Sequence, residues 1–427
     1  MRAAPILSMT SQDVARLLLS RQTAGLRSFS AASKLMHGQR KAPMRMTTEE
    51  AFVKTLQMHG IKNAFGIIGS AMMPISDLFP KAGIKFWDCA HECNAGMMAD
   101  GYTRTTGKMS MMIAQNGPGI TNFLTPVKTA YWNHTPLLLV TPQAANKKVD
   151  INGDRIGLTT SVDVGIQGDA GLVAEQLLQQ LAPEAGSGRA ERAALVKEKK
   201  AAWAAELESL DHELDDEGTT WNPSRAWRAI MRVMPKEANM SSDIGNNCAI
   251  GNAYPSFASP RKYLAPGLFG PCGYGFPAIL GAKVGNPDVP VVGFAGDGAF
   301  GISVNEITAC GRGDWPPVTM VVFRNFQWGA EKRNTTLWYD DNFVGTELNK
   351  GVEYAEMAKA CGLKGVKVQS VEQLERALSS AIEGQMKRGE TTLVEVLLNQ
   401  ELGEPFRRDA MKAPVQVAPI NASDMAE

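Results

Sequence analysis

Short apolar runs alternate with helix-forming stretches in two separate parts of the sequence. The first part contains four runs that predict buried strands: residues 64–68, 84–89, 109–114 and 137–141. The second part contains five more: residues 239–244, 291–295, 318–323, 366–368 and 393–398. Strands that alternate with helices form parallel sheets. We therefore predict a protein of the α/β class with two parallel-sheet domains.

The second domain is organised around residues 290–329. The strand over residues 291–295 stops at Gly296-Asp297-Gly298, and we predict a helix from about Ser303 to Gly311 before the next strand. That next strand leads directly to Asn325. In an open parallel sheet both strand ends lie at the edge where ligands bind. The pattern therefore predicts an acid and an amide close together at this edge.

The groups at these two strand ends suit a divalent cation. Mg²⁺ takes oxygen ligands, and Asp297 offers a carboxylate, Asn325 an amide oxygen and Gln327 a main-chain carbonyl. The glycines beside Asp297 let the main chain approach a diphosphate, whose charge is favoured by the start of a helix. A Gly-Asp-Gly triplet alone more often marks a tight turn. The second strand and its Asn ending, at this spacing, favour the metal and diphosphate site.

This pattern resembles the diphosphate-binding motif of thiamine-diphosphate-dependent enzymes, whose second strand usually ends in Asn-Asn. Here it ends in Arg324-Asn325, which keeps the Asn that coordinates the metal in the family. Three longer stretches are similar to the sulfoacetaldehyde acetyltransferases of that family: GLFGPCGYGFPAILGAKVGNPDVPVVGFAGDGAFGIS, RNFQWGAEKRNTTLWYDDNFVGTEL and LNQELGEPFRRDAMK. The resemblance covers about residues 46–147 and 149–427. It implies thiamine diphosphate and Mg²⁺ as cofactors.

The resemblance also implies which residues bind the cofactor. The metal ligands correspond to Asp297, Asn325 and Gln327. Gly270 and Cys272 correspond to main-chain contacts to the aminopyrimidine ring, although many relatives have a bulky aliphatic residue where Cys272 stands. The whole cofactor-binding set is Gly270, Cys272, Gly296, Asp297, Gly298, Ala299, Asn325, Gln327 and Gly329.

Glu92 is the candidate catalytic residue. It follows the predicted strand over residues 84–89 and opens a helix, where a solvated acid favoured by the helix dipole is the ordinary interpretation. The resemblance instead matches His91-Glu92 to the motif whose glutamate contacts the aminopyrimidine ring and activates the cofactor. The cofactor would then stabilise a carbanion, while the protein supplies orientation and electrostatics.

Several other polar residues have two interpretations each. His91 and His134 are more often packed, hydrogen-bonded residues than substrate contacts. The loop of residues 116–119 is an ordinary turn or, by the resemblance, a border of the neighbouring subunit's active site. Four arginines suit a sulfonate or phosphate through paired hydrogen bonds, but salt bridges explain them equally well: Arg324, Arg333, Arg407 and Arg408.

The reaction implied by the resemblance converts sulfoacetaldehyde and phosphate to acetyl phosphate and sulfite. The family also implies an active site between two subunits, with Glu92 from one and Asp297 and Asn325 from the other. A homodimer or homotetramer is therefore expected. Two alternatives remain open: an acetolactate-synthase-like or decarboxylating enzyme of the same family, and a non-catalytic chain that binds partner subunits.

Relative to that family, the chain lacks a segment. After Lys148, the segment that begins at Val149 resembles a late strand of the family's central domain. The end of the first domain and most of the central domain are therefore missing. An incomplete gene model or a skipped exon is favoured over a genuinely shortened enzyme. The predicted division is a leader (1–45), a pyrimidine-binding domain (46–148), a central remnant (149–185), a charged helical linker (186–221), a diphosphate-binding domain (222–414) and a tail (415–427).

Composition narrows the partners and the compartment. The 44 basic and 44 acidic side chains cancel, so no nucleic-acid partner is expected. No apolar run approaches the roughly 18 residues of a membrane span. The six cysteines form no Cys-x-x-Cys pair and are typical of reduced thiols. Residues 1–45 are rich in Arg and Ser with Asp13 as their single acid, which predicts a transit peptide, mitochondrial rather than plastid. A disordered extension or a mis-assigned start codon is the alternative.

Overall fold

The computed structural model describes residues 46–69, 72–115, 118–141, 179, 188–212, 221–257, 259–267, 269–338, 341 and 343–400. The predicted leader, nearly all of the predicted central remnant and the predicted tail lie outside these residues. Among the residues described, no helix is both long enough and apolar enough to cross a membrane.

The first described domain contains a parallel sheet of four strands, as the sequence predicted. The sheet has the order β2-β1-β3-β4. Its strands are β1 (Asn63–Gly66), β2 (Lys85–Asp88), β3 (Ser110–Ile113) and β4 (Leu137–Val140). Its helices are α2 (Thr48–Met58), α3 (Met73–Ser76), α4 (Phe79–Ala82), α5 (Glu92–Thr106), α6 (Pro118–Asn122) and α7 (Leu124–Trp132).

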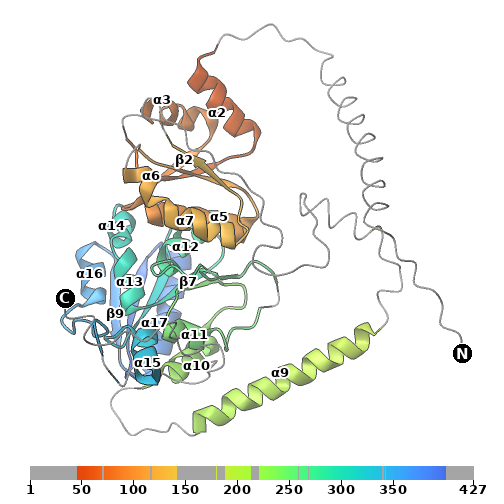
Figure 1. Cartoon of the computed structure of the whole chain (residues 1–427), viewed down its shortest axis with the longest axis vertical. Coiled ribbons are helices and arrows are strands. Elements are labelled where there is room, and N and C mark those ends of the chain that lie inside the picture. Colours follow the sequence, from red (N-terminus) through yellow and green to blue (C-terminus); the bar gives the residue numbers. More distant parts are fainter. Residues whose placement is uncertain are drawn as a thin grey trace, which may run out of the picture. The chain divides into compact units, whose positions relative to one another are not determined.

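The second described domain contains a parallel sheet of six strands with the order β6-β5-β7-β8-β10-β9. These strands are β5 (Asn239–Ser242), β6 (Tyr263–Leu264), β7 (Val291–Gly296), β8 (Thr319–Arg324), β9 (Lys364–Val368) and β10 (Thr392–Leu397). The helices are α10 (Pro223–Val233), α11 (Asn246–Gly251), α12 (Gly275–Gly285), α13 (Asp297–Ser303), α14 (Glu306–Gly311), α15 (Gly329–Trp338), α16 (Tyr354–Ala360), α17 (Val371–Glu383) and the π-helical turn η2 (Gly384–Arg388). Figure 1 shows this domain in green to blue.

The central strands β7 and β8 of the six-stranded sheet are buried on both faces, which explains why they read as largely apolar runs. Val291 and Ala295 of β7 belong to one hydrophobic core together with residues of α12, α14 and α16. Val292 and Phe294 alternate with them and belong to a second core with residues of α10, α11 and α17. The period-2 alternation of a strand thus places neighbouring residues in different cores.

The predicted start of the helix after β7 is wrong. The sequence predicted a helix from about Ser303, whereas α13 begins at Asp297 directly after β7, and Val304-Asn305 separate it from α14. Gly296 is extended, with φ −70° and ψ 161°, and Asp297 provides an acid in the first helical turn. The glycines of this segment suggested a loop, but they do not prevent the helix.

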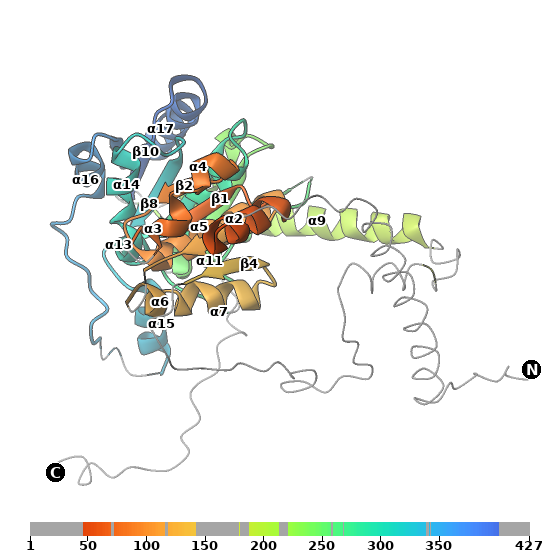
Figure 2. The same ribbon diagram turned by 90° about the horizontal axis from the view of Figure 1, so that it is seen from above.

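The helix α9 (Arg189–His212) lies within the predicted charged helical linker of residues 186–221. Figure 2 shows it as one uninterrupted helix. Nearly all of its described side chains are exposed, as mixed charge on a helix predicts.

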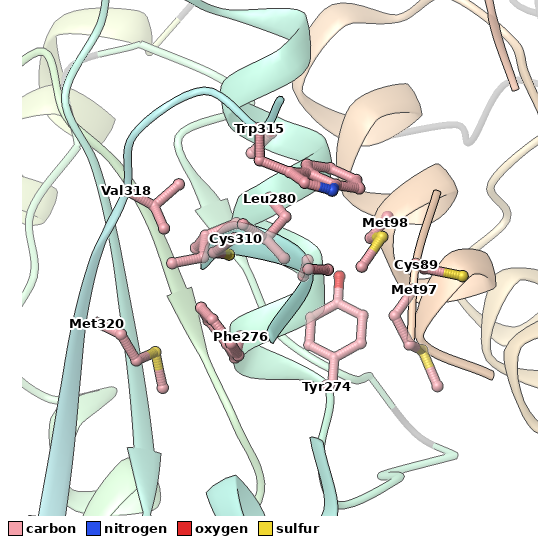
Figure 3. Packing of buried hydrophobic residues seen from close by; sticks show 14 of the residues in the cluster. Cys89, Met97, Met98, Tyr274, Phe276, Leu280, Cys310, Trp315, Val318 and Met320 are labelled. Carbon is pink, nitrogen blue, oxygen red and sulfur yellow. The ribbon is translucent and has the colours of Figure 1, made fainter. Parts of the chain in front are cut away.

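Helices α5 and α12 pack against each other very closely and join the two domains in one core. A Cβ atom at Gly281 would lie 1.7 Å from the carbonyl oxygen of Met98, so only glycine fits there. Figure 3 shows Met97 and Met98 of α5 beside Tyr274, which precedes α12. The small residues that the sequence shows in both helices therefore serve a close helix contact.

Candidate active site

The structure brings Asp297 and Asn325 together. β7 and β8 are parallel neighbours, and Gly296 pairs with Phe323, so the two polar residues follow adjacent strand ends. Both line a cavity of about 160 Å³. The cavity lining also includes the other seven residues of the predicted cofactor-binding set: Gly270, Cys272, Gly296, Gly298, Ala299, Gln327 and Gly329.

The Asp297 carboxylate connects the two strand ends. Its Oδ1 accepts a hydrogen bond from the N–H of Gly298 at 3.0 Å, and its Oδ2 accepts one from the N–H of Phe326 at 2.7 Å. The side chain is buried, and burial raises the pKa of Asp297 to about 6, although these two N–H donors act in the opposite direction. The carboxylate therefore holds the loop after β8 against the start of α13.

The two glycines beside Asp297 have different surroundings. A Cβ atom at Gly296 would meet no other atom within 4 Å, so the main chain there borders open space. A Cβ atom at Gly298 would lie 2.8 Å from the Trp328 ring. Gly298 is thus required for the packing of Trp328, whereas Gly296 leaves the strand end accessible to a ligand.

The oxygen atoms that line the cavity suit a hard cation that is also coordinated by a bound anion. Asn325 and Gln327 are buried, and the Gln327 side chain donates from Nε2 to the carbonyl of Gln400 at 2.9 Å. Asn247 Oδ1 and Gln327 Oε1 are buried without a hydrogen-bond partner among the described residues. Those residues contain no group of three or more His, Cys, Asp or Glu side chains that could by itself hold a metal ion. A cation beside Asp297 would be held by that carboxylate, by amide and main-chain oxygens, and by oxygens of a ligand such as a diphosphate; Glu331 is the second carboxylate in the cavity lining.

Asp243 is a structural component that the sequence analysis did not identify. It directly follows β5, and its carboxylate accepts hydrogen bonds from the N–H groups of Gly273 at 3.0 Å and Gly275 at 2.6 Å. Burial raises the pKa of Asp243 to about 6. This carboxylate fixes the glycine-rich loop in which Gly270, with φ 61°, and Cys272 line the cavity. An acid at a strand end was the available signal, but its partners lie about 30 residues further along the chain.

Glu92 lies in the first domain and is not among the residues that line this cavity. It is the first residue of α5, and its Oε2 accepts a hydrogen bond from Asn122 Nδ2 at 2.9 Å. His91 precedes it and caps the helix, since its Nδ1 accepts from the N–H of Cys93 at 3.1 Å. His134, with φ 52°, lies in the turn after α7. Asn116 and Gly117 of the predicted border loop lie outside the described residues.

The interpretation of Arg324 as an anion contact is wrong. Its side chain is 1% exposed and forms an ion pair with Glu395 of β10, so the guanidinium is used inside the fold. Arg333 of α15 is also buried and does not line the cavity. Arg407 and Arg408 lie outside the described residues.

Comparison with known protein families identifies both domains. Residues 46–164 match the N-terminal TPP binding domain of thiamine pyrophosphate enzymes, and residues 243–396 match their C-terminal TPP binding domain. The chain also resembles the thiamine diphosphate-dependent 4-hydroxybenzoylformate decarboxylase of Rhodococcus jostii RHA1, with a TM-score of 0.64 and 16% identity over 84% of this chain and 100% of that chain. At this identity the likeness concerns the fold alone.

Two curated proteins are much closer in sequence. The probable sulfoacetaldehyde acetyltransferase of Rhizobium meliloti is 47% identical over 90% of this chain and 99% of its own length. The sulfoacetaldehyde acetyltransferase of Roseovarius nubinhibens is 47% identical over 90% of this chain and 98% of its own. The first alignment spans 586 positions against 427 residues in the whole chain, so at least 159 positions have no counterpart here.

Proposed function

The chain belongs to the sulfoacetaldehyde acetyltransferases of the thiamine pyrophosphate enzyme family, and from this premise we propose that it converts sulfoacetaldehyde and phosphate to acetyl phosphate and sulfite. It is a transferase that moves an acetyl group to phosphate. The observation that supports this most strongly is the cavity that is lined by all nine residues that the family resemblance assigned to the cofactor.

The cavity residues have distinct roles in this proposal. The Asp297 carboxylate, the Asn325 amide oxygen and the Gln327 main-chain carbonyl would hold Mg²⁺, and the open space beside Gly296 would accommodate the diphosphate. Gly270 and Cys272, which line the same cavity, would contact the aminopyrimidine ring. When bound, thiamine diphosphate supplies the electron sink that a carbon–sulfur bond cleavage requires. The protein residues orient it and exclude water from its reactive carbon.

Glu92 supplies the activating carboxyl group. When the cofactor is bound, the Glu92 carboxyl group would hold a proton at a ring nitrogen of the aminopyrimidine and act there as a general acid. Glu92 does not line the cavity in the second domain of the same chain. We therefore place it in the active site of a partner protomer.

A homodimer or homotetramer follows from that arrangement. Helix α7 displays an apolar face on the surface of the first domain: Leu124 is 72% exposed and Tyr131 is 55% exposed, with Val127 and Trp132 also exposed. Large exposed apolar side chains grouped on one helix are typical of a surface that another subunit covers. This face supports self-association.

The test of the function is the dependence of sulfite release on phosphate. The purified protein, given sulfoacetaldehyde, thiamine diphosphate and Mg²⁺, should release sulfite and form acetyl phosphate when phosphate is added. Pyruvate turnover without phosphate would instead support the acetolactate-synthase-like alternative. Turnover of neither substrate would contradict both enzymatic proposals.

The substitution Asp297→Ala tests the cavity itself. Removing the single carboxylate of the proposed metal site should abolish Mg²⁺-dependent binding of thiamine diphosphate, measured by calorimetric titration. The variant should also lose sulfite release. A parent protein that binds no cofactor would support the non-catalytic alternative.

A mitochondrial location remains a proposal based on the leader. Residues 1–45 fused to a fluorescent protein should direct it to mitochondria because an Arg-rich, acid-poor segment is typical of transit peptides. A diffuse cytosolic signal would contradict this.

A further inference from the structure

The loop after β8 has an unusual main-chain conformation at Phe326. This residue has φ 60°, in the left-handed region that residues with a side chain seldom adopt. It stands between Asn325 and Gln327, the two residues after β8 that the proposed function assigns to the cation. Whatever keeps Phe326 in this conformation also sets the directions of the Asn325 side chain and the Gln327 carbonyl.

Two hydrogen bonds fix the main chain of Phe326. Its N–H donates to Oδ2 of Asp297 at 2.7 Å. Its carbonyl accepts from the N–H of Leu348 at 2.8 Å. The loop is thus tied to the proposed metal carboxylate on one side and to the segment before α16 on the other.

The side chain of Phe326 is held by two cations. The Cζ atom of Arg324 lies 4.6 Å from the centre of the Phe326 ring, and Nζ of Lys350 lies 6.0 Å from it. Both distances are within the range of cation–π interactions. The ring therefore has a fixed partner immediately beside the loop, in addition to the main-chain hydrogen bonds.

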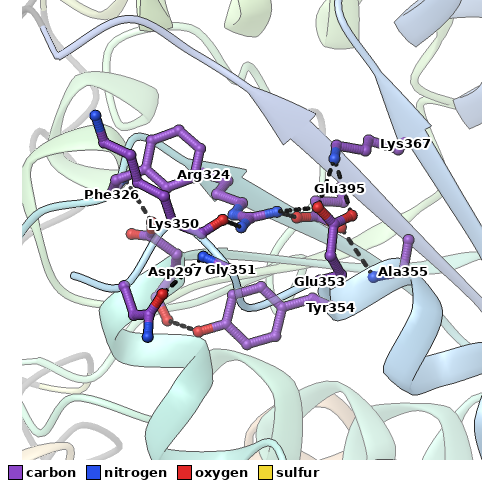
Figure 4. Close-up of polar contacts among 11 residues, drawn as sticks. Asp297, Arg324, Phe326, Lys350, Gly351, Glu353, Tyr354, Ala355, Lys367 and Glu395 are labelled. Carbon is purple, nitrogen blue, oxygen red and sulfur yellow. Dashed lines mark hydrogen bonds and ion pairs between the residues drawn. The ribbon is translucent and has the colours of Figure 1, made fainter.

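Arg324 is itself anchored in the interior. Its guanidinium forms an ion pair with Glu395, which is fully buried, and Nη2 donates to the carbonyl of Lys350 at 2.6 Å. The second oxygen of Glu395 accepts from the N–H of Ala355 at 2.9 Å. Figure 4 shows these contacts in a row to the right of Asp297. A buried ion pair separates only at a large cost, so the guanidinium provides a rigid support.

We propose that Arg324, Phe326 and Glu395 are positioning residues that set the affinity of the cavity for Mg²⁺ and thiamine diphosphate. This inference rests on the proposed function, because it assumes that the loop after β8 holds the cation. The family usually has Asn where Arg324 stands. In this chain the substitution supplies a guanidinium that fixes the adjoining loop from behind, while the metal-binding Asn325 is retained.

The first test changes Phe326 alone. Phe326→Gly permits the left-handed conformation but removes the ring, so calorimetric titration should show about tenfold weaker Mg²⁺-dependent binding of thiamine diphosphate. Phe326→Tyr keeps the ring and should bind as the parent does. Parent-like affinity in Phe326→Gly would overturn the proposal.

The second test separates positioning from stability. Arg324→Met alone would leave Glu395 buried without its guanidinium, so the double variant Arg324→Met/Glu395→Met is used, because replacing both charges by apolar groups preserves folding in comparable cases. The double variant should keep the parent's Tm within a few degrees but need about tenfold more Mg²⁺ for half-saturation. Parent-like half-saturation in a folded double variant would overturn the proposal.

The matched control replaces an exposed ion pair remote from the cavity. Arg232 of α10 and Glu375 of α17 lie 2.5 Å apart, and Arg232→Met/Glu375→Met should not change the half-saturating Mg²⁺ concentration. An equal loss in this control would assign the effect to general destabilisation and overturn the proposal. A parent protein without any Mg²⁺-dependent binding would overturn the proposed function itself. If the parent binds thiamine diphosphate and the variants bind it equally well, only the positioning role is overturned.

Discussion

Glu306, the first residue of α14, is a fully buried carboxyl group at the contact between the two sheet domains. It accepts hydrogen bonds from the N–H of Ala90 at 3.0 Å and from Asn94 Nδ2 at 2.7 Å, both at the start of α5. Burial raises the pKa of Glu306 to about 7, against the opposing effect of these donors. The residue therefore keeps its proton to a higher pH in the folded protein than in the unfolded chain.

The substitution Glu306→Gln should flatten the pH dependence of stability. A carboxyl group with a raised folded-state pKa contributes stability below its unfolded pKa of 4.5, and this contribution is lost as pH rises through about 7. Between pH 5 and 8 the parent should lose more stability than the variant, by roughly 3 kcal/mol at most. Urea unfolding at several pH values measures the difference. Glu198→Gln, on the exposed surface of α9, should leave the slope unchanged.

The roles of the residues at and near the cavity could be predicted only where the side-chain chemistry permits few functions. Asp297 and Asn325 were identified because an acid and an amide at adjacent strand ends suit a metal. Asp243 was missed because a carboxylate that holds a distant glycine loop looks like any loop acid in the sequence. For Arg324 the sequence left an anion contact and a salt bridge equally open, because it does not show Glu395 of a later strand beside it.

Among the elements, α5 and α12 form a contact that depends on glycine. A Cβ atom at Gly101 of α5 would lie 2.1 Å from the carbonyl oxygen of Ala278, and one at Gly281 would lie 1.7 Å from that of Met98. Both contacts are with main chain, which cannot move aside as a flexible side chain can. These two helices therefore determine how closely the domains approach.

Gly281→Ala should destabilise the protein by about 1–3 kcal/mol, since the added methyl group must separate the two helices. Thermal and urea unfolding measure this loss. Gly384→Ala is the control, because a Cβ atom there would meet only the flexible ends of Glu390 and Arg388. Equal stability of Gly281→Ala and the parent would show that the helices are not in close contact in solution.

The elements themselves were predicted well where periodicity is strong. All nine predicted strands are present, with ends that differ by a few residues. The signal is strongest for buried strands such as β7 and β8, which read as largely apolar runs. The start of α13 was missed because Gly298 and Gly301 weaken the helical pattern. Tertiary packing, including that of Trp328 on Gly298, overrides this local preference.

At the scale of the whole molecule, the proposed site needs residues from two protomers. Mixing Glu92→Gln with Asp297→Ala should restore activity, because a mixed dimer contains one site with both native residues. Random exchange of subunits gives about one quarter of the parent activity in a twofold-symmetric dimer. Each variant alone should be inactive. A mixture that stays inactive after subunit exchange would place Glu92 and Asp297 of one chain in the same site.

The absent segment is the second feature at this scale. In the alignment with the Rhizobium meliloti protein, at least 159 positions have no residue of this chain. Both cofactor-binding domains are nevertheless present. We predict that the segment is lost between residues 146 and 150, where the two stretches that resemble the family meet. Sequencing the transcript across those codons should reveal the additional coding sequence of an incomplete gene model. A transcript that matches the present chain would support a genuinely shortened or exon-skipped form.

The packing of Trp328 on Gly298 has a practical consequence. The indole forms part of the cavity wall next to the Asp297 loop, so a cofactor that enters the cavity changes the polarity around it. Indole emission is sensitive to such a change. The difference between the fluorescence of the parent and that of Trp328→Phe isolates this signal from the seven other tryptophans of the chain. The protein thus contains its own optical reporter of cofactor entry.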